Sequence, residues 1–181
     1  MTPAHPSFDD VLVFWFSDPA RWWRKDPTFD AEISDRFLAL HDFLDRGERE
    51  DWLQTARSTL AYVIVLDQLS RNMFRGTARM FASDARAHAA AQRALDRGDD
   101  RALSKAERTF LYMPFMHSED VADQDRCVAL FTSAAPDQLR FAEQHRDIIR
   151  RFGRFPHRNA LLGRESTPEE QEFLKQPGSS F

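Results

Sequence analysis

The sequence predicts an all-α protein with about eight helices in a single compact domain that spans residues 1–181. Three observations lead to this prediction. Apolar side chains recur at helical spacing in nearly every long segment. No segment shows sustained alternation of apolar and polar residues, and the Asn-Gly and Asp-Gly turns typical of hairpins are absent. A chain of 181 residues with 42% hydrophobic and 30% charged residues is typical of one soluble globular domain.

Apolar stripes that end at glycines indicate the first helices. One stripe ends before Gly47, which is a natural stop for a helix. A long helix is predicted over residues 52–73. Ser83 caps the following helix, which extends through Leu95 and stops at Gly98. The stripe that ends at Gly47 consists of Ile33, Phe37, Leu40 and Leu44.

Capping signals predict the next two helices. Ser104 and Glu107 have capping-box spacing and begin a short helix, which Pro114 ends. Ser118 caps a further helix, which extends through Phe131.

Prolines mark the first turns of the last two helices. Pro136 begins a helix that extends to Phe152 and stops at Gly153. Residues 167–170 combine a capping Thr, a first-turn Pro and a capping-box Glu, so a short final helix starts there. We expect a frayed tail at about residues 176–181.

Composition excludes several classes of protein. The single cysteine, Cys127, excludes an internal disulfide bond and a Cys-rich zinc site. The N-terminus lacks a signal-peptide pattern, and no stretch approaches the ~20 apolar residues that cross a bilayer. Standard motifs for phosphate loops, zinc proteases and serine hydrolases are absent. We therefore expect a cytoplasmic protein without membrane contact, without a resident cofactor and without a metal.

Positive charge gathers in one segment of an otherwise acidic chain. The net charge is −4, yet residues 140–164 hold seven arginines against Glu143 and Asp147. Because phosphate contacts need such clusters, nucleic-acid binding stays a minor hypothesis. The arginines are Arg140, Arg146, Arg150, Arg151, Arg154, Arg158 and Arg164.

Polar side chains occupy a face of the 52–73 helix that should be core. Asp67 and Arg71 continue the stripe of Leu60 and Ile64, and they are i,i+4 partners. Gln68 and Asn72 form a second such pair beside them, and Arg75 follows one turn later. Burying an unpaired charge is very costly. These groups therefore pair in a structural network that fixes the helix register, or they bind a ligand.

Two more polar residues lie on apolar faces. His145 is at the centre of a face formed by Phe141, Ile148 and Phe152, and Gln124 is similarly placed in the preceding helix. A lone histidine in such a place is a hydrogen-bonded core residue or a ligand. Both interpretations stay open at this point.

Two short segments concentrate further polar groups. His117 and Glu119 lie at a predicted helix start, where a solvated loop or a site would both fit. Residues 151–159 then gather arginines, a histidine and an asparagine around a helix stop and restart. A helix that begins near Pro156 would direct free N–H groups towards an anion, whereas a solvated arginine face is the simpler alternative. The polar residues of this segment are Arg151, Arg154, His157, Arg158 and Asn159.

Several long strings resemble the bacterial family known as domain of unknown function 924. Together they cover roughly residues 9–174, and the resemblance departs at Ser70, where a common family form has Pro. The strings are residues 11–16 (VLVFWF), 66–76 (LDQLSRNMFRG), 81–84 (FASD), 113–119 (MPFMHSE), 151–159 (RFGRFPHRN), 162–164 (LGR) and 167–170 (TPEE).

This resemblance implies a tetratricopeptide (TPR)-like arrangement of antiparallel helix pairs. It implies no activity. Its signature positions include the polar residues discussed above, together with Asp84 and Ser118. A buried polar network that defines the fold would produce the same coincidence.

The polar residues therefore suggest a site that binds a small anionic molecule and performs acid–base chemistry on it. Histidine suits proton transfer because it titrates near neutral pH, and arginine suits carboxylate and phosphate groups. The alternative is a TPR-like module that binds an acidic peptide or protein. The oligomeric state is not predicted. The candidate catalytic residues are His117, His145, His157, Asp67 and Glu119, and the candidate ligand-binding residues are Arg71, Arg75, Gln68, Asn72, Gln124, Arg154, Arg158 and Asn159.

Overall fold

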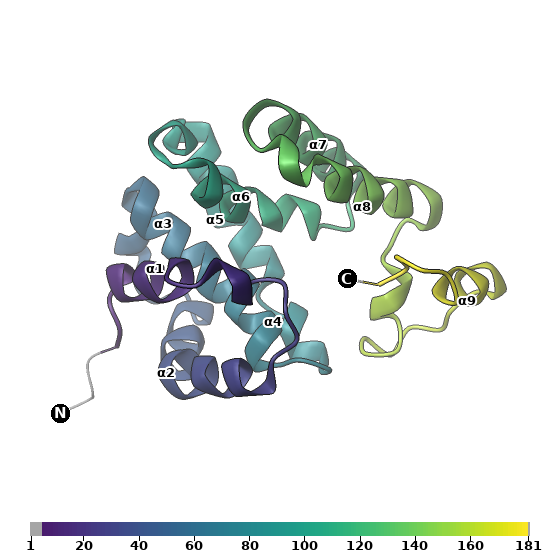
Figure 1. Ribbon diagram of the computed structural model, residues 1–181, viewed down its shortest axis with the longest axis horizontal. Helices are drawn as coiled ribbons and strands as arrows, with labels where there is room; N and C mark the ends of the chain where they lie inside the picture. Colours follow the sequence, from purple (N-terminus) through teal and green to yellow (C-terminus); the bar gives the residue numbers. More distant parts are fainter. Residues whose placement is uncertain (1–4, 181) are drawn as a thin grey trace.

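The computed structural model describes residues 5–180, and these residues form helices and connecting turns without a β-strand (Figure 1). The all-α prediction is confirmed. Helices α3 and α4 are joined by a π-helical turn, so they count as one of eight helices in this range. The elements are α1 (Phe8–Phe16), α2 (Pro27–Asp45), α3 (Ala56–Val63), the π-helical turn η3 (Ile64–Leu69), α4 (Ser70–Met73), α5 (Asp84–Arg97), α6 (Lys105–Met116), α7 (Val121–Ala134), α8 (Leu139–Phe152) and α9 (Pro168–Leu174).

Short 3-10 turns connect these helices. The turn that matters most for the site is η7, which follows α8. The turns are η1 (Pro19–Arg21), η2 (Glu50–Gln54), η4 (Ala78–Phe81), η5 (Asp99–Ala102), η6 (Pro136–Gln138) and η7 (Pro156–Arg158).

Capping signals in the sequence correctly place several helix ends. Ser104 and Glu107 form the capping box of α6, and Thr167 and Glu170 form that of α9. Gly153 ends α8 with a φ of 69°, a left-handed conformation that favours glycine.

The predicted end of a helix at Pro114 is wrong, because α6 continues through Pro114 to Met116. Proline lacks an N–H group and so removes one backbone hydrogen bond from the helix. Residues 110–116 are all buried, and the burial of this apolar turn offsets the lost bond.

Two predicted helix starts are also wrong. Residues 50–54 form a 3-10 turn, and α3 begins only after Thr55, whose backbone is extended. Asp120 caps α7 in place of Ser118, since its carboxylate accepts hydrogen bonds from two backbone N–H groups of the first turn. A carboxylate at this position also interacts favourably with the helix dipole.

Two apolar clusters of different size hold the helices together. The main core draws side chains from α1 to α8, and α6, α7 and α8 pack one on the next. A smaller cluster of Ile148, Ile149 and Phe155, with Phe152 and Phe173 beside it, joins the end of α8 to the C-terminal segment. Figure 1 shows α7, α8 and α9 to one side of α1–α4.

The C-terminal residues continue in turns after α9. In the segment where a frayed tail was expected, Ser179 is buried and its hydroxyl donates a hydrogen bond to the Leu174 carbonyl. Phe181 lies outside the described residues. No helix within residues 5–180 has the length and apolar character to cross a lipid bilayer.

Candidate functional site

The π-helical turn η3 creates the centre of the candidate site. A π turn is wider than an α turn and often occurs at functional sites. Here the Leu66 carbonyl accepts hydrogen bonds from the hydroxyls of Ser70 at 2.8 Å and Ser83 at 2.6 Å. His41 Nε2 lies 2.7 Å from Ser70 Oγ, and all three polar side chains are buried. Because both hydroxyls are directed at Leu66, this array stabilises the π turn and does not form a nucleophile.

Asp67, within η3, pairs with His117 at the end of α6. The distance between Asp67 Oδ1 and His117 Nδ1 is 2.8 Å, and Asp67 is 0% exposed. Burial opposes ionisation of Asp67, but the charge of Arg71 and the hydrogen bonds from His117 and Gln68 outweigh it and hold the pKa of Asp67 well below its ordinary value. Burial, followed by the nearby Arg71, lowers the pKa of His117. The pair is therefore a carboxylate and a neutral imidazole whose Nδ1 carries the proton.

Three further donors and acceptors fix this pair in place. Gln68 Nε2 donates to Asp67 Oδ2, and Arg71 Nη1 lies 3.3 Å from Asp67 Oδ1. Arg71 also forms a bidentate pair with Asp84 at the start of α5, at 2.9 and 3.0 Å. The structure thus brings the predicted Asp67, Gln68, Arg71 and His117 together.

Arg158, in η7, approaches the same centre from the C-terminal segment. Its Nη2 donates to the His117 carbonyl at 3.0 Å, and its Nη1 lies 3.5 Å from Asp84 Oδ2. The guanidinium is placed between the rings of Phe81 and Phe155, 4.6 and 4.5 Å from their centroids. Burial, and then the charge of Arg71, lowers the pKa of Arg158 to about 10. Its buried Nε makes no hydrogen bond within residues 5–180.

His145 and His157 lie next to His117, so the three candidate histidines converge. The ring centroids of His117 and His145 are 6.5 Å apart, and Phe155 is 5.6 Å from both His145 and His157. His145 Nδ1 donates to the Phe141 carbonyl at 2.7 Å. Burial is the main cause that lowers the pKa of His145 to about 3 and that of His157 to about 4. Both side chains are therefore neutral near pH 7.

Glu119 borders this group and connects it to the C-terminal segment. Arg164 donates to both oxygens of Glu119, at 2.7 and 3.0 Å, and the Phe155 backbone N–H donates at 2.7 Å. Burial acts to raise the pKa of Glu119, but these donors outweigh it and lower the pKa. Glu119 is thus an ion-pair partner in this structure.

Five of the predicted site residues lie outside this group. Asn72 and Arg75 both bind Asp30 on α2, with distances of 2.7 Å to the Asn72 amide and 2.7 Å to Arg75 Nε. Gln124 donates to the carbonyls at the end of α6 and in the turn that follows. Arg154 and Asn159 bind Glu170. Of the four arginines among the candidate ligand-binding residues, Arg75 and Arg154 therefore do not lie with Arg71 and Arg158.

Sequence reasoning missed three residues of the site. Asp84 and Arg164 lie in strings that carry the family resemblance, and that was the available signal for them. Phe155, which contacts two of the histidines, has no distinguishing signal because the chain is rich in Phe.

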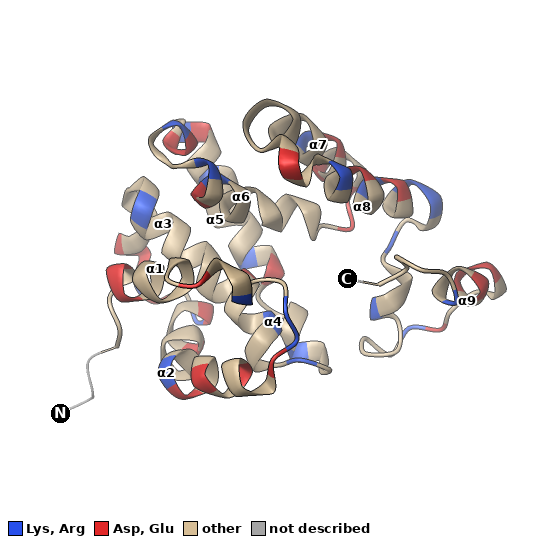
Figure 2. Cartoon of the chain, in the orientation of Figure 1, with Lys and Arg blue, Asp and Glu red and all other residues tan. Residues whose placement is uncertain are grey.

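The arginine cluster of residues 140–164 is largely neutralised. Figure 2 shows acidic and basic residues side by side along α8 and α9. Six of the seven arginines form ion pairs within the described residues, which leaves little free positive charge for phosphates. The pairs are Arg146–Asp147, Arg150–Asp125, Arg151–Glu169, Arg154–Glu170, Arg158–Asp84 and Arg164–Glu119.

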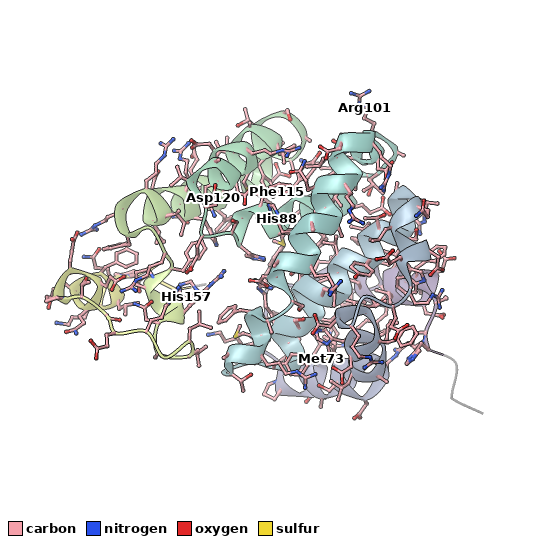
Figure 3. The ribbon with its side chains drawn as sticks, turned by 180° about the vertical axis from the view of Figure 1, so that it is seen from behind. Met73, His88, Arg101, Phe115, Asp120 and His157 are labelled. Carbon is pink, nitrogen blue, oxygen red and sulfur yellow. The ribbon has the colours of Figure 1, made fainter. Side chains whose placement is uncertain are left out.

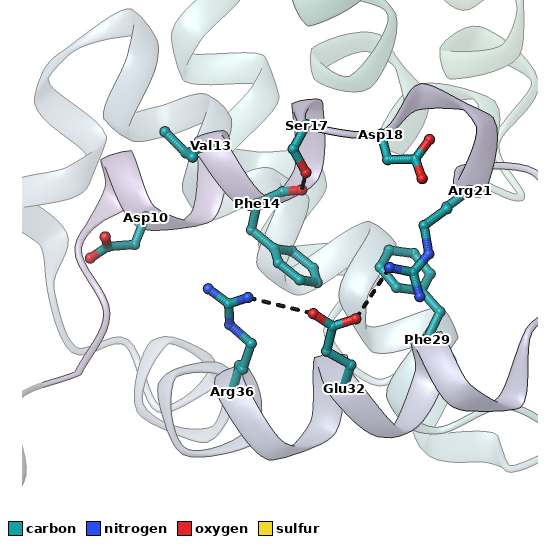
Figure 4. A pocket seen from close by; sticks show the side chains of 9 residues that line it. All are labelled: Asp10, Val13, Phe14, Ser17, Asp18, Arg21, Phe29, Glu32 and Arg36. Atoms are coloured by element: carbon teal, nitrogen blue, oxygen red, sulfur yellow. Dashed lines mark hydrogen bonds and ion pairs between the residues drawn. The ribbon is translucent and has the colours of Figure 1, made fainter.

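Two surface hollows lie elsewhere, on either side of α1. One of about 250 Å³ is bounded by α1, η1 and α2 (Figure 4), and one of about 330 Å³ reaches Arg57 and Glu107. Val13 borders both hollows and is 70% exposed. In the first hollow, Arg21 and Arg36 both pair with Glu32. Residues 5–180 contain no group of three His, Cys, Asp or Glu side chains arranged to hold a metal ion.

The chain matches the model of a bacterial protein family of unknown function, DUF924, over residues 11–178. It belongs to the DUF924 family. Among solved structures, it is similar to a protein of unknown function from Agrobacterium tumefaciens, with 46% sequence identity and a TM-score of 0.90. The alignment covers 93% of this chain and 96% of that chain. A comparison with functionally curated proteins finds no match.

Proposed function

We propose that this DUF924 protein is an enzyme that performs acid–base chemistry on a small polar molecule bound beside His117. The observation that carries the proposal is the Asp67–His117 pair, in which a fully buried carboxylate orients an imidazole that is itself 14% exposed. His117 Nε2 makes no hydrogen bond within residues 5–180. A base needs such a nitrogen to take a proton from its ligand.

The chemistry follows from the orientation of the imidazole. Asp67 accepts the Nδ1 proton, so the lone pair of His117 lies on Nε2. When Nε2 takes a proton from the ligand, the Asp67 carboxylate stabilises the imidazolium that forms. The lowered pKa of His117 keeps the imidazole neutral, and hence able to accept a proton, near pH 7.

The charges around His117 restrict the ligand. Arg158 and Arg164 each have a buried Nε without a hydrogen bond within residues 5–180. Arg71 and Arg164 are each held by a carboxylate in a bidentate pair, whereas Arg158 only lies 3.5 Å from one oxygen of Asp84. We therefore assign recognition of an oxygen of the ligand to Arg158 alone. A molecule with one carboxylate, or with a polarised carbonyl, suits this site better than a multiply charged phosphate.

The test is a titration of the protein with acetate, lactate, succinate and inorganic phosphate, followed by NMR of the histidine ring protons. We expect a saturable shift of the His117 resonances with a monocarboxylate, and its loss in Arg158→Gln. Arg151→Gln is the matched control, because Arg151 forms an exposed pair with Glu169 outside the site. If none of the four anions shifts His117, or if both variants lose the response equally, the assignment fails.

The alternative is a TPR-like peptide-interaction module, and one observation favours it. The two hollows described above border the exposed Val13 on α1 and not His117. The occupant would be a short peptide with an apolar side chain against Val13. A partner held in 1:1 stoichiometry by the wild type, lost by Val13→Glu and kept by Phe141→Glu would favour this alternative. Phe141 is a matched control because it is also exposed and lies on a distant helix.

A further inference from the structure

The C-terminal unit, defined here as residues 153–178, is tied together by its own polar contacts. Arg154 donates to both oxygens of Glu170, at 2.6 and 2.8 Å. Asn159 donates to the same carboxylate at 3.3 Å and to Ser166 at 3.0 Å, while the Thr167 backbone N–H donates to it at 2.7 Å. Glu170 is therefore the hub of the unit, which can move as one body.

The apolar anchor of this unit is separate from the main core. Phe155 is fully buried, and it packs with Ile148, Ile149, Phe152 and Phe173 in the smaller cluster. That cluster joins the unit to the end of α8, and none of its members within residues 5–180 comes from α1–α6. The unit can therefore separate from α3–α6 while the main core stays closed.

The contacts that hold the unit over His117 are mainly polar, together with the stacking of Arg158 on the ring of Phe81. Arg158 reaches the His117 carbonyl and the Asp84 carboxylate, while Glu119 binds Arg164 and the Phe155 backbone N–H. Glu119 and Arg164 are 28% and 24% exposed, so water can replace their contacts when they separate. Figure 3 shows this part of the molecule from behind, with His157 labelled.

Two glycines bracket the segment that carries His157 and Arg158. Gly153 has a φ of 69° and Gly163 a φ of 65°. A Cβ atom at either position would meet no atom within 4 Å, so backbone conformation and not lack of space favours glycine there. Gly153 lies at the junction of α8 and the C-terminal unit, where a hinge residue absorbs changes of φ and ψ, whereas Gly163 lies within the unit.

We propose that the C-terminal unit is a hinged cover over His117, latched by Glu119, and that it opens to admit the ligand. The role of the cover in admitting a ligand to His117 rests on the proposed function, whereas the opening movement itself does not depend on that function. In the closed state the cover excludes water from the neutral histidines, which strengthens electrostatic interactions around the ligand. Neither of the two hollows described above borders His117 in this closed state, and opening supplies the access.

The experiment measures access to His117 without any ligand. The protein is treated with diethyl pyrocarbonate, which reacts with exposed neutral imidazole, and modification of each histidine is followed by peptide mass spectrometry. His88 serves as the internal reference, since it lies on α5 outside the cover. Hydrogen exchange of the Phe155 amide is measured in parallel, because this N–H donates to the latch.

Glu119→Ala and Arg164→Ala remove the latch from its two sides. We expect each to raise the rate of His117 modification roughly five- to thirty-fold relative to His88, the factor that corresponds to losing one or two kcal/mol. Glu169→Ala is the matched control: it removes the exposed pair between Glu169 of the unit and Arg151 on α8, and it should leave the rate unchanged. Circular dichroism confirms that each variant is folded.

The outcomes separate the cover from the proposed function. Unchanged His117 modification and unchanged Phe155 exchange in both latch variants overturn the cover. An equal increase in the rate of His117 modification in the Glu169→Ala control also overturns the cover, because loss of any surface ion pair would then have the same effect as loss of the latch. If His117 becomes accessible as expected but no anion shifts its resonances, the cover stands and the proposed acid–base function falls.

Discussion

Two carboxylates, Asp67 and Glu170, each form the hub of a buried polar network, yet the networks differ in reach. The donors to Glu170 all come from residues 154–170, so this network closes on itself within one segment. The partners of Asp67 come from η3, α4 and the end of α6, and the His117 pair spans 50 positions of sequence. Local closure makes a rigid unit, whereas long-range pairing joins separate helices.

The networks also differ in what can change protonation near neutral pH. The Glu170 network contains an arginine, an amide and backbone groups, none of which titrates there. The Asp67 network contains His117, with His145 and His157 beside it. Buried polarity alone therefore does not distinguish a structural network from a site. The feature that distinguishes the site is a titratable side chain, His117, with a ring nitrogen that makes no hydrogen bond within residues 5–180.

The largest expected effect comes from removing Asp67. Asp67→Ala leaves His117 without its carboxylate and Arg71 with Asp84 as its remaining carboxylate, and we expect a loss of ~3–5 kcal/mol in the free energy of unfolding. Urea denaturation measures it. Glu170→Ala is the contrast, because its network is local and remote from the main core. We expect it to speed hydrogen exchange within residues 153–178 and to leave the main transition in place.

The reverse pattern would break the comparison. If Asp67→Ala costs less than ~1 kcal/mol while Glu170→Ala shifts the whole transition, then the C-terminal network and not the central one holds the helices together. Such a result would also remove the rigid support that the Asp67–His117 pair needs.

A smaller effect should appear in the pH dependence of stability. The pKa of His145 falls from 6.5 to about 3 on folding, so the unfolded chain takes up a proton first as the pH falls. Its stabilising contribution is complete above pH 6.5 and is lost progressively towards pH 3. The pKa of Glu170 falls from 4.5 to about 2, mainly because Arg154 donates to it, so its contribution is lost only between those values.

The two networks should therefore weaken in different pH windows. We expect His145→Phe to flatten the plot of unfolding free energy against pH between 6.5 and 4.5, and Glu170→Gln to flatten it only below 4.5. Urea denaturation at a series of pH values measures both slopes. Identical profiles in the two variants would contradict the separation of the networks.

The sequence predicts the fold well because its signals are local. Capping boxes at Ser104 and Thr167 and the glycine stop at Gly153 fix helix ends through neighbouring residues. Pro114 misled the prediction because its cost is local, while the burial that offsets it comes from distant helices. The π turn at Leu66 likewise depends on Ser83, which lies 17 positions away.

The candidate site was predictable only in part, for the same reason. The i,i+4 spacing of Asp67 and Arg71 placed them together, and the structure agrees. Helical spacing does not reveal which residue of another element comes to meet each side chain. Nothing in the sequence therefore indicated that Asp30 and Glu170 are partners of these arginines. Arg75 and Arg154 were expected to bind a ligand, but they bind Asp30 and Glu170 instead.

Replacement of Arg75 should have the smallest effect on the free energy of unfolding, and it also serves as a control for the response of His117 to a ligand. It was expected to bind the ligand, but its guanidinium forms a bidentate pair with Asp30 near the surface. Arg75→Ala should cost no more than ~1 kcal/mol by urea denaturation, because exposed pairs contribute little. It should leave the His117 resonances and their response to monocarboxylates unchanged. A loss of that response in Arg75→Ala would place Asp30 and α2 within the site, and the boundary between the structural pairs and the His117 group would have to be redrawn.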